Sequence, residues 1–190
     1  KQIQLFLQKT IEKADSNIKA KVKEDNSTAG MGTTIVIAWV HKDVVHISWC
    51  GDSRAYLFNS KSGMVRLSKD HSYVQQLVDE GKLDAELAFD HPNSNIITRS
   101  LGDTQVKANP DYISKNISEG DMILLCSDGL CGLCRDEEIM SILEHNSENI
   151  EQCKNELIAA ALEAGGYDNV TVALFQVVSV EKGEELGTDT

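Results

Sequence analysis

The sequence predicts a single α+β domain in which antiparallel sheets are covered by helices. Four β-branched runs with short polar connections occupy residues 33–67, amphipathic helical patterns lie toward both ends of the chain, and an apolar run fills residues 122–127. Short connections favour antiparallel strands, and helices on the outside would complete the layers. The 190 residues fit one domain, with no repeat or internal linker.

The chain begins with a helix and continues as strands. Leu7, Ile11 and Ile18 recur at helical spacing, which predicts an amphipathic helix over residues 2–24 packed on a core. The β-branched runs predict strands over residues 33–40, 44–49, 55–58 and 64–67. The tight turns between them indicate an antiparallel meander. Trp39 and Trp49 occupy strand positions typical of the core.

A segment of mixed character follows. The pattern of Val74, Leu77 and Val78 predicts a short helix over residues 72–80, residues 84–89 predict a second, and Pro92 then breaks the pattern. We expect this segment to form a mobile flap, followed by a loop around Pro110.

The second half contains the central strand. The apolar run at residues 122–127 predicts a strand buried on both faces, with Asp128 at its end and Gly129 allowing a sharp turn. Acidic residues open a helix over residues 136–144, a second helix over residues 149–164 ends at two glycines, and residues 169–178 form a last strand. Residues 1–180 are therefore the domain, and residues 181–190 a flexible acidic tail.

Composition limits the classes of partner and the compartment. The net charge of −12 argues against nucleic acid or an anionic membrane as a partner. No apolar run approaches the roughly 20 residues that span a bilayer, and the N-terminal segment has no signal-peptide core. The cysteine count is odd, with Cys50 and Cys126 in strand patterns, so we expect reduced thiols in a cytoplasmic protein.

Three aspartates adjoin a glycine or an asparagine at the edge of an apolar strand: Asp52, Asp128 and Asp168. Rigid strand ends commonly present metal-binding side chains, and their oxygens suit Mg²⁺ or Mn²⁺. A cluster of aspartates would be unfavourable unless cations neutralised it. The spacing leaves two alternatives open, because a single Ser-Asp-Gly can equally cap a turn.

Six short motifs occur in order along the chain. They are Gly30-Met31-Gly32-Thr33-Thr34, Gly51-Asp52-Ser53-Arg54-Ala55-Tyr56, Asp70-His71, Thr98-Arg99-Ser100-Leu101-Gly102-Asp103, Leu125-Cys126-Ser127-Asp128-Gly129-Leu130 and Tyr167-Asp168-Asn169-Val170-Thr171-Val172. Each is weak alone, but together they resemble the metal-dependent (PPM-type, class 2C) protein serine/threonine phosphatases, bacterial branch. The mixed segment with Val74 and His91-Pro92 is similar to the flap of that branch.

The resemblance implies a four-layer α-β-β-α sandwich with a metal centre at one edge. Asp128 and Asp168 match ligands of the first metal, and Asp52 matches the aspartate that, commonly with Asp128, holds a weakly bound third metal. Two Mn²⁺ or Mg²⁺ ions would bind a bridging water and align it for attack on phosphoserine or phosphothreonine in a phosphoprotein. The complete domain would hold two to three such ions, and we expect their binding to be weakened or absent in this chain. The resemblance implies no catalytic residue beyond the metal ligands.

The remaining motif residues receive supporting roles. Gly129 and Ser53 flank the ligands, and Asn169 fixes the turn that positions Asp168. Arg54 orders the Asp52 loop through hydrogen bonds, or alternatively binds substrate phosphate.

The flap assignment comprises His71, Val74 and His91. His71 is either a structural histidine or a proton-transfer group near the flap. The pair Cys131 and Cys134 has redox or zinc spacing, but no second pair accompanies it, which favours a structural role.

The N-terminal motifs of the family do not occur in residues 1–32. In the family these motifs, Asn-Glu-Asp and Asp-Gly-Met-Gly-Gly-His, contribute an aspartate that bridges two metals. We therefore expect an N-terminally truncated domain with little activity, either a fragment of an ordinary phosphatase or a natural short form. The latter would act as a non-catalytic, pseudophosphatase-like binding module.

Two further expectations concern the function class and the oligomeric state. The chain could instead be an acidic cation-binding domain unrelated to phosphate. A sheet edge left open where the absent strands would pair predicts dimerisation.

Overall fold

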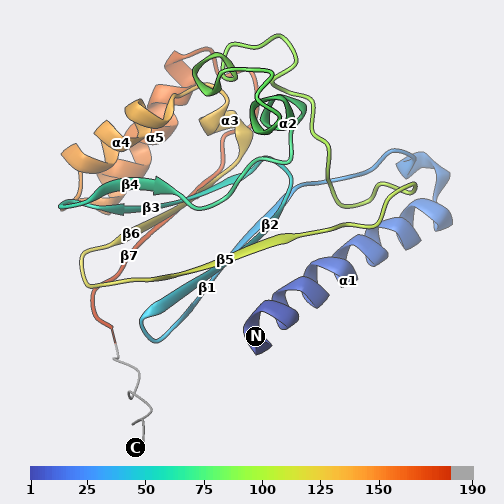
Figure 1. Cartoon of the computed structure of the whole chain (residues 1–190), viewed down its shortest axis with the longest axis horizontal. Helices are drawn as coiled ribbons and strands as arrows, with labels where there is room; N and C mark the ends of the chain where they lie inside the picture. The colour runs from blue at the N-terminus through green and yellow to red at the C-terminus, as the bar shows by residue number, and fades with distance from the viewer. Residues whose placement is uncertain (181–190) are drawn as a thin grey trace, which may run out of the picture.

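The computed structural model describes residues 1–180, so the tail predicted at residues 181–190 lies outside the described part. Two antiparallel sheets stack face to face, with helix α1 (Gln2–Glu24) on one side and helices α4 (Asp136–His145) and α5 (Ile150–Glu163) on the other (Figure 1). This order of layers confirms the predicted α-β-β-α sandwich. Within residues 1–180, no helix is long and apolar enough to cross a membrane.

The first sheet has the strand order β1-β2-β5. Its strands are β1 (Ile35–His41), β2 (Val44–Cys50) and β5 (Asp111–Asn116). Side chains alternate along β2, so that Val45, Ile47 and Trp49 join the core between the sheets, while Cys50 packs with Ile11 of α1. One face of this sheet therefore forms the sandwich core, and the other holds α1.

The second sheet has the strand order β4-β3-β6-β7. Its strands are β3 (Arg54–Asn59), β4 (Gly63–Arg66), β6 (Met122–Cys126) and β7 (Val172–Gln176). Strand β6 is buried on both faces, as predicted: Ile123 lies in the core between the sheets, whereas Met122 and Leu124 pack on the helical side. A central, fully packed strand gives a rigid base to the residues that follow it.

Short helices fill the connections. Helix α2 (Tyr73–Asp79) confirms the first helix predicted in the mixed segment, and the second is a 3₁₀ turn, η2 (Ala85–Leu87). A further 3₁₀ turn, η1 (Asn26–Thr28), follows α1. Helix α3 (Asp128–Cys131) begins directly after β6 and has no counterpart in the sequence prediction. In Figure 1, α2 and α3 lie near each other at one end of the second sheet.

The predicted single meander is wrong, because the β1–β2 and β3–β4 hairpins belong to different sheets. The chain changes sheets at Gly51, whose φ is +124° and whose added Cβ would lie 2.3 Å from Cγ2 of Thr34. Strand β5 lies where a loop was expected, since its last three residues are exposed and give no apolar alternation. Trp39 is also outside the predicted core: it is 41% exposed and packs edge-on against Phe6.

Each sheet ends in strands that are paired on one side only within residues 1–180: β1 and β5 in the first, β4 and β7 in the second. Strand β1 also exposes Trp39 and Val40. Such an edge can pair with another chain. Dimerisation through an open edge stays a prediction.

A buried carboxylate attaches α1 to the loop before β5. Asp15 is 3% exposed and accepts hydrogen bonds from the backbone N–H groups of Gly102 (2.8 Å) and Ala108 (3.3 Å) and from Nζ of Lys19 (2.8 Å). Burial by itself raises the pKa of Asp15, but the Lys19 ammonium and the two amides outweigh it and hold the pKa below its ordinary value. The carboxylate therefore supports the fold in its ionised form.

Replacing this carboxylate by a neutral amide, Asp15→Asn, is expected to lower the free energy of unfolding at pH 7 by about 1.5–3 kcal/mol, because charge-assisted hydrogen bonds are lost. The folded pKa is lowered, so the contribution of Asp15 is present above the ordinary value of 3.8 and disappears as the pH falls through the folded value. Urea unfolding at pH 7 and at acid pH measures both effects. The control is Glu12→Gln, which removes a surface pair with Lys107 and is expected to change stability by less than about 0.5 kcal/mol. Equal effects of the two variants at pH 7 would contradict this account.

Candidate active site

The three predicted ligands line one cavity of about 990 Å³ at the end of the second sheet. Asp52 enters from the β2–β3 turn, Asp128 from the start of α3, and Asp168 from the loop before β7. The cavity is also lined by residues from α2, η2 and their connections: Ser72, Val74, Gln75, Val78, Ala85, Leu87, Phe89, Ser94 and Asn95. The structure thus brings three aspartates from distant parts of the sequence to one cavity.

Asp52 lies in an unfavourable electrostatic environment. Burial raises the pKa of its carboxyl to about 6, and the negative charge of Asp128 adds to the effect. The charged form is therefore disfavoured in the fold, so without a cation stability falls as the pH rises from 3.8 to about 6. A cation bound between the two carboxylates would reverse this penalty.

Asp128 is exposed at the first position of α3, where the partial positive charge of backbone N–H groups favours a carboxylate. The expected sharp turn at Gly129 is wrong, because Gly129 lies inside α3 and has no positive φ. This position nevertheless has no room for a side chain, because an added Cβ would lie 2.4 Å from the carbonyl oxygen of Asn169. Gly129 therefore permits the loop of Asp168 to approach Asp128.

Ser127 joins the same two segments. Its hydroxyl donates to the carbonyl of Asn169 (3.1 Å) and accepts from the N–H of Thr171 (3.0 Å), and its own N–H donates to the carbonyl of Thr171 (3.1 Å). Asp168 is exposed, and one of its carboxylate oxygens accepts from the N–H of Asn169 at 2.7 Å. These bonds place Asp168 beside the end of β6 and fix its loop.

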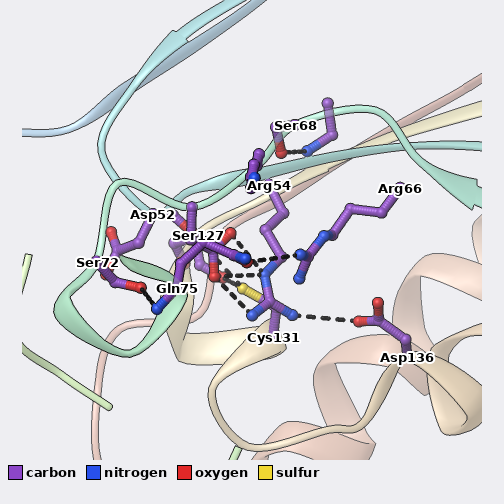
Figure 2. Close-up of polar contacts among 12 residues, drawn as sticks. Asp52, Arg54, Arg66, Ser68, Ser72, Gln75, Ser127, Cys131 and Asp136 are labelled. Atoms are coloured by element: carbon purple, nitrogen blue, oxygen red, sulfur yellow. Dashed lines mark hydrogen bonds and ion pairs between the residues drawn. The ribbon is translucent and has the colours of Figure 1, made fainter. Parts of the chain in front are cut away.

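Arg54 is fully occupied by protein partners. Its Nε and Nη2 donate to the two oxygens of Asp70, at 3.0 and 2.7 Å, and Nη1 donates to Asp136 at 3.2 Å. The hydroxyl of Tyr56 also donates to Asp136, at 2.8 Å. Figure 2 shows Arg54 reaching Asp136 at the start of α4. The guanidinium therefore orders the turn that carries Asp52, and its engagement leaves little capacity for substrate phosphate.

The remaining predicted residues lie at different distances from the cavity. Val74 is buried and lines it. Ser53 hydrogen bonds to Thr34 through its hydroxyl at 2.9 Å. His71 is buried at the base of the flap, and His91 does not line the cavity; its Nδ1 accepts from the N–H of Asn93 at 3.1 Å.

Sequence reasoning assigned no role to several cavity residues. Asp70 and Asp136 hold Arg54, and Arg66 donates to Gln75 of α2 at 3.1 Å, as Figure 2 shows. Arg135 pairs with Asp90 and covers the ring of Phe89 at 4.3 Å, linking α4 to the flap. Of these residues, only Asp70 could have been singled out from the sequence, because it belongs to one of the six motifs. The roles of the others depend on packing between segments that are distant in the sequence.

The cysteine pair faces the core. Cys131 and Cys134 are both buried. A hydrogen bond with Cys126 and burial raise the pKa of Cys131, and burial raises the pKa of Cys134 to about 11. Thiols in such surroundings are protonated and poor metal ligands, so the pair contributes packing beneath the cavity.

The donor chemistry of the cavity fits a divalent cation. Within residues 1–180, none of Asp52, Asp128 and Asp168 forms an ion pair with a basic side chain. Carboxylate oxygens are preferred ligands of Mg²⁺ and Mn²⁺. However, no group of three or more His, Cys, Asp or Glu side chains among the described residues is spaced to hold a metal ion. These residues therefore assemble only part of a coordination shell.

Comparison with known proteins gives matches over most of the chain. Residues 2–170 match the protein phosphatase 2C family. The serine/threonine phosphatase Stp of Listeria innocua is 34% identical over 184 residues, which are 97% of this chain and 72% of Stp. PstP of Mycobacterium tuberculosis is 36% identical over 181 residues, 94% of this chain and 34% of PstP.

Solved structures agree with this assignment. Stp1 from Staphylococcus aureus has a TM-score of 0.84 and 34% identity, covering 96% of this chain and 69% of Stp1. The catalytic domain of PstP, in complex with two manganese ions, has a TM-score of 0.79 and 34% identity, covering 91% and 70%. The chain belongs to the protein phosphatase 2C family, whose members similar to it are serine/threonine protein phosphatases.

Proposed function

We propose that this chain carries the part of a metal-dependent phosphatase site that holds Asp52, Asp128 and Asp168, and that its substrates are phosphoserine or phosphothreonine residues of proteins. The observation that carries the proposal is the meeting of these three aspartates, unpaired by any described basic side chain, in one cavity of a protein phosphatase 2C fold. A cavity of about 990 Å³ can also enclose a phosphorylated side chain with its flanking backbone.

Each residue has a defined task in this proposal. Asp128 and Asp168 hold one cation, and Asp52 together with Asp128 holds a second, more weakly bound one. Bound Mn²⁺ or Mg²⁺ supplies a water of lowered pKa and neutralises charge on the phosphate. Ser127 and Gly129 keep the Asp168 loop against α3, and Arg54 keeps the Asp52 turn in place through Asp70.

A second candidate is a non-catalytic binding module that retains the fold and the flap. It is favoured by one observation: the described residues include no group of three or more metal-ligating side chains at ligand spacing. A cavity of this kind could still receive a phosphopeptide without hydrolysing it. Activity separates the two candidates, whereas metal binding separates both from a chain that has no cation site.

The proposal makes Asp128 a cation ligand. We expect Mn²⁺ to bind the 190-residue chain, as measured by isothermal titration calorimetry, and Asp128→Asn to weaken binding by about tenfold or more, because the variant loses a charged ligand. The matched control is Asp103→Asn, at an exposed aspartate that caps a turn outside the cavity. Equal Mn²⁺ affinity of the Asp128 variant and the control would contradict the assigned ligand.

A separate prediction concerns turnover. We expect the 190-residue chain by itself to hydrolyse p-nitrophenyl phosphate slowly in the presence of Mn²⁺, because its carboxylates form only part of a coordination shell. Steady-state hydrolysis with and without EDTA measures the metal-dependent rate, and Asp128→Asn gives the background. Robust manganese-dependent turnover by the unmodified chain would overturn this prediction. Mn²⁺ binding without turnover on any phosphorylated substrate, even in a longer form of the chain, would favour a cation-binding domain.

A further inference from the structure

The dipeptide Asp70-His71 holds both ends of the turn that carries Asp52. Asp70 binds the guanidinium of Arg54 at the far end of the turn, as described above. His71 binds Gly51 at the near end: Nδ1 accepts from the N–H of Gly51 at 3.0 Å, and the N–H of His71 donates to the carbonyl of Gly51, also at 3.0 Å. Asp52 thus lies between two residues that are each fixed by the same dipeptide.

The ring of His71 is itself fixed on several sides. It is 6% exposed and stacks on Trp49, with ring centroids 6.1 Å apart and planes 18° apart. Trp49 is held in turn by a hydrogen bond from Nε1 to the carbonyl of Lys69 at 2.8 Å. The backbone carbonyl of His71 accepts from the N–H of Thr98 at 2.7 Å. A ring with these neighbours has little freedom to rotate.

The hydrogen bonds determine which nitrogen carries the proton. Because Nδ1 accepts from an amide, the proton of a neutral ring lies on Nε2, which is 3.1 Å from an oxygen of Asp111. Nη1 of Arg99 lies 3.2 Å from the other oxygen of Asp111 and 3.2 Å from Nε2 of His71. It donates to Asp111 and balances its charge, because Nε2 is itself a donor when Nδ1 accepts from Gly51. Burial lowers the pKa of His71, which agrees with a neutral ring. The chain Arg99–Asp111–His71–Gly51 therefore runs from β5 to the turn that carries Asp52.

The backbone at Gly51 needs such support. Its φ of +124° is open to glycine and strained for other residues, and Thr34 occupies the space next to its Cα. A glycine with this freedom does not by itself define the direction of the following residue. An acceptor held in place at the N–H of Gly51 does define this direction, because it fixes the orientation of the amide plane.

We infer that His71 is a positioning residue for the phosphatase site: as the neutral Nε2–H tautomer, it fixes the Gly51 amide and thereby the direction of the Asp52 carboxylate. It touches neither substrate nor cation, and transfers no proton. The effect of His71 on cation binding rests on the proposed function, whereas its role in fixing the turn at Gly51 does not.

Two substitutions separate the two nitrogens. In His71→Asn, the amide oxygen can take the place of Nδ1 and still accept from Gly51. In His71→Gln, the longer amide can reach Asp111 in place of Nε2, and the acceptor for Gly51 is lost. Both variants lose the stacking on Trp49. His46→Asn is the control, because Nδ1 of His46 also makes one hydrogen bond, to the hydroxyl of Tyr112 at 2.7 Å, on β2 outside the cavity.

NMR of the full chain tests the inference without any cation. Long-range ¹H–¹⁵N spectra of the wild-type chain are expected to show His71 as the Nε2–H tautomer. Hydrogen exchange at the Gly51 amide is expected to be about five- to tenfold faster in His71→Gln than in His71→Asn, because His71→Gln loses the hydrogen bond to this amide. The Nδ1–H tautomer, or equal exchange in the two folded variants, would overturn the inference. If His71→Gln does not fold, the wild-type tautomer alone decides.

Mn²⁺ titration of the same samples separates this inference from the proposed function. We expect an affinity about tenfold lower for His71→Gln, with His71→Asn and His46→Asn close to the wild type, as for residues that orient metal ligands. Differences in amide exchange with no Mn²⁺ binding in any sample would support the role of His71 in the turn and reject the proposed metal site. Equal Mn²⁺ affinity in all variants would contradict an effect of His71 on cation binding.

Discussion

The candidate site depends on bringing the carboxylates of Asp52 and Asp128 into one cavity, where neither pairs with a basic side chain among residues 1–180. Burial of Asp52 and, to a smaller extent, the negative charge of Asp128 raise the pKa of Asp52 to about 6, so the fold opposes the charged state that a cation site requires. The surrounding framework resists this repulsion at fixed points. At Gly51 the chain passes from the first sheet to the second. Arg54 is bound to Asp70 and Asp136, and Ser127 joins the end of β6 to the loop of Asp168. The support comes from both sheets and from α4, which explains why the cavity lies where these elements converge.

The hydrophobic cores and the buried carboxylate of Asp15 stabilise the fold without the candidate ligands. The core between the sheets, the core under α4 and α5, and the buried carboxylate of Asp15 under α1 involve no candidate ligand. The raised pKa of Asp52, by contrast, is an unfavourable term at the cavity, where functional sites commonly carry such costs. The flap side is less tightly held. Arg135 joins it to α4 through exposed Asp90 and the ring of Phe89, and interactions between such exposed charges contribute little to stability.

Much of the fold and part of the site could be predicted from the sequence. The apolar run of β6 and the periodicity of α1 and α5 specified their elements, because full burial leaves a clear pattern in residue types. β5 was missed because half of it is exposed, and the meander was wrong because local turns do not say which sheet a hairpin joins. The order of the motifs predicted Asp52, Asp128 and Asp168 as ligands, and the structure places all three in one cavity. The partners of Arg54 and the contact of Gly129 with Asn169 could not be predicted, since they join residues about 16 to 82 positions apart in the chain.

The proposed cation site is tested most directly at Asp52, whose pKa burial and the charge of Asp128 raise and a bound divalent cation would lower. The most direct measurement is a pH titration of the Asp52 carboxyl carbon by NMR, with and without Mg²⁺. The account predicts a midpoint at about pH 6 in the absence of the cation and a clear fall when Mg²⁺ is added. A midpoint near the ordinary value of 3.8, unchanged by Mg²⁺, would contradict it.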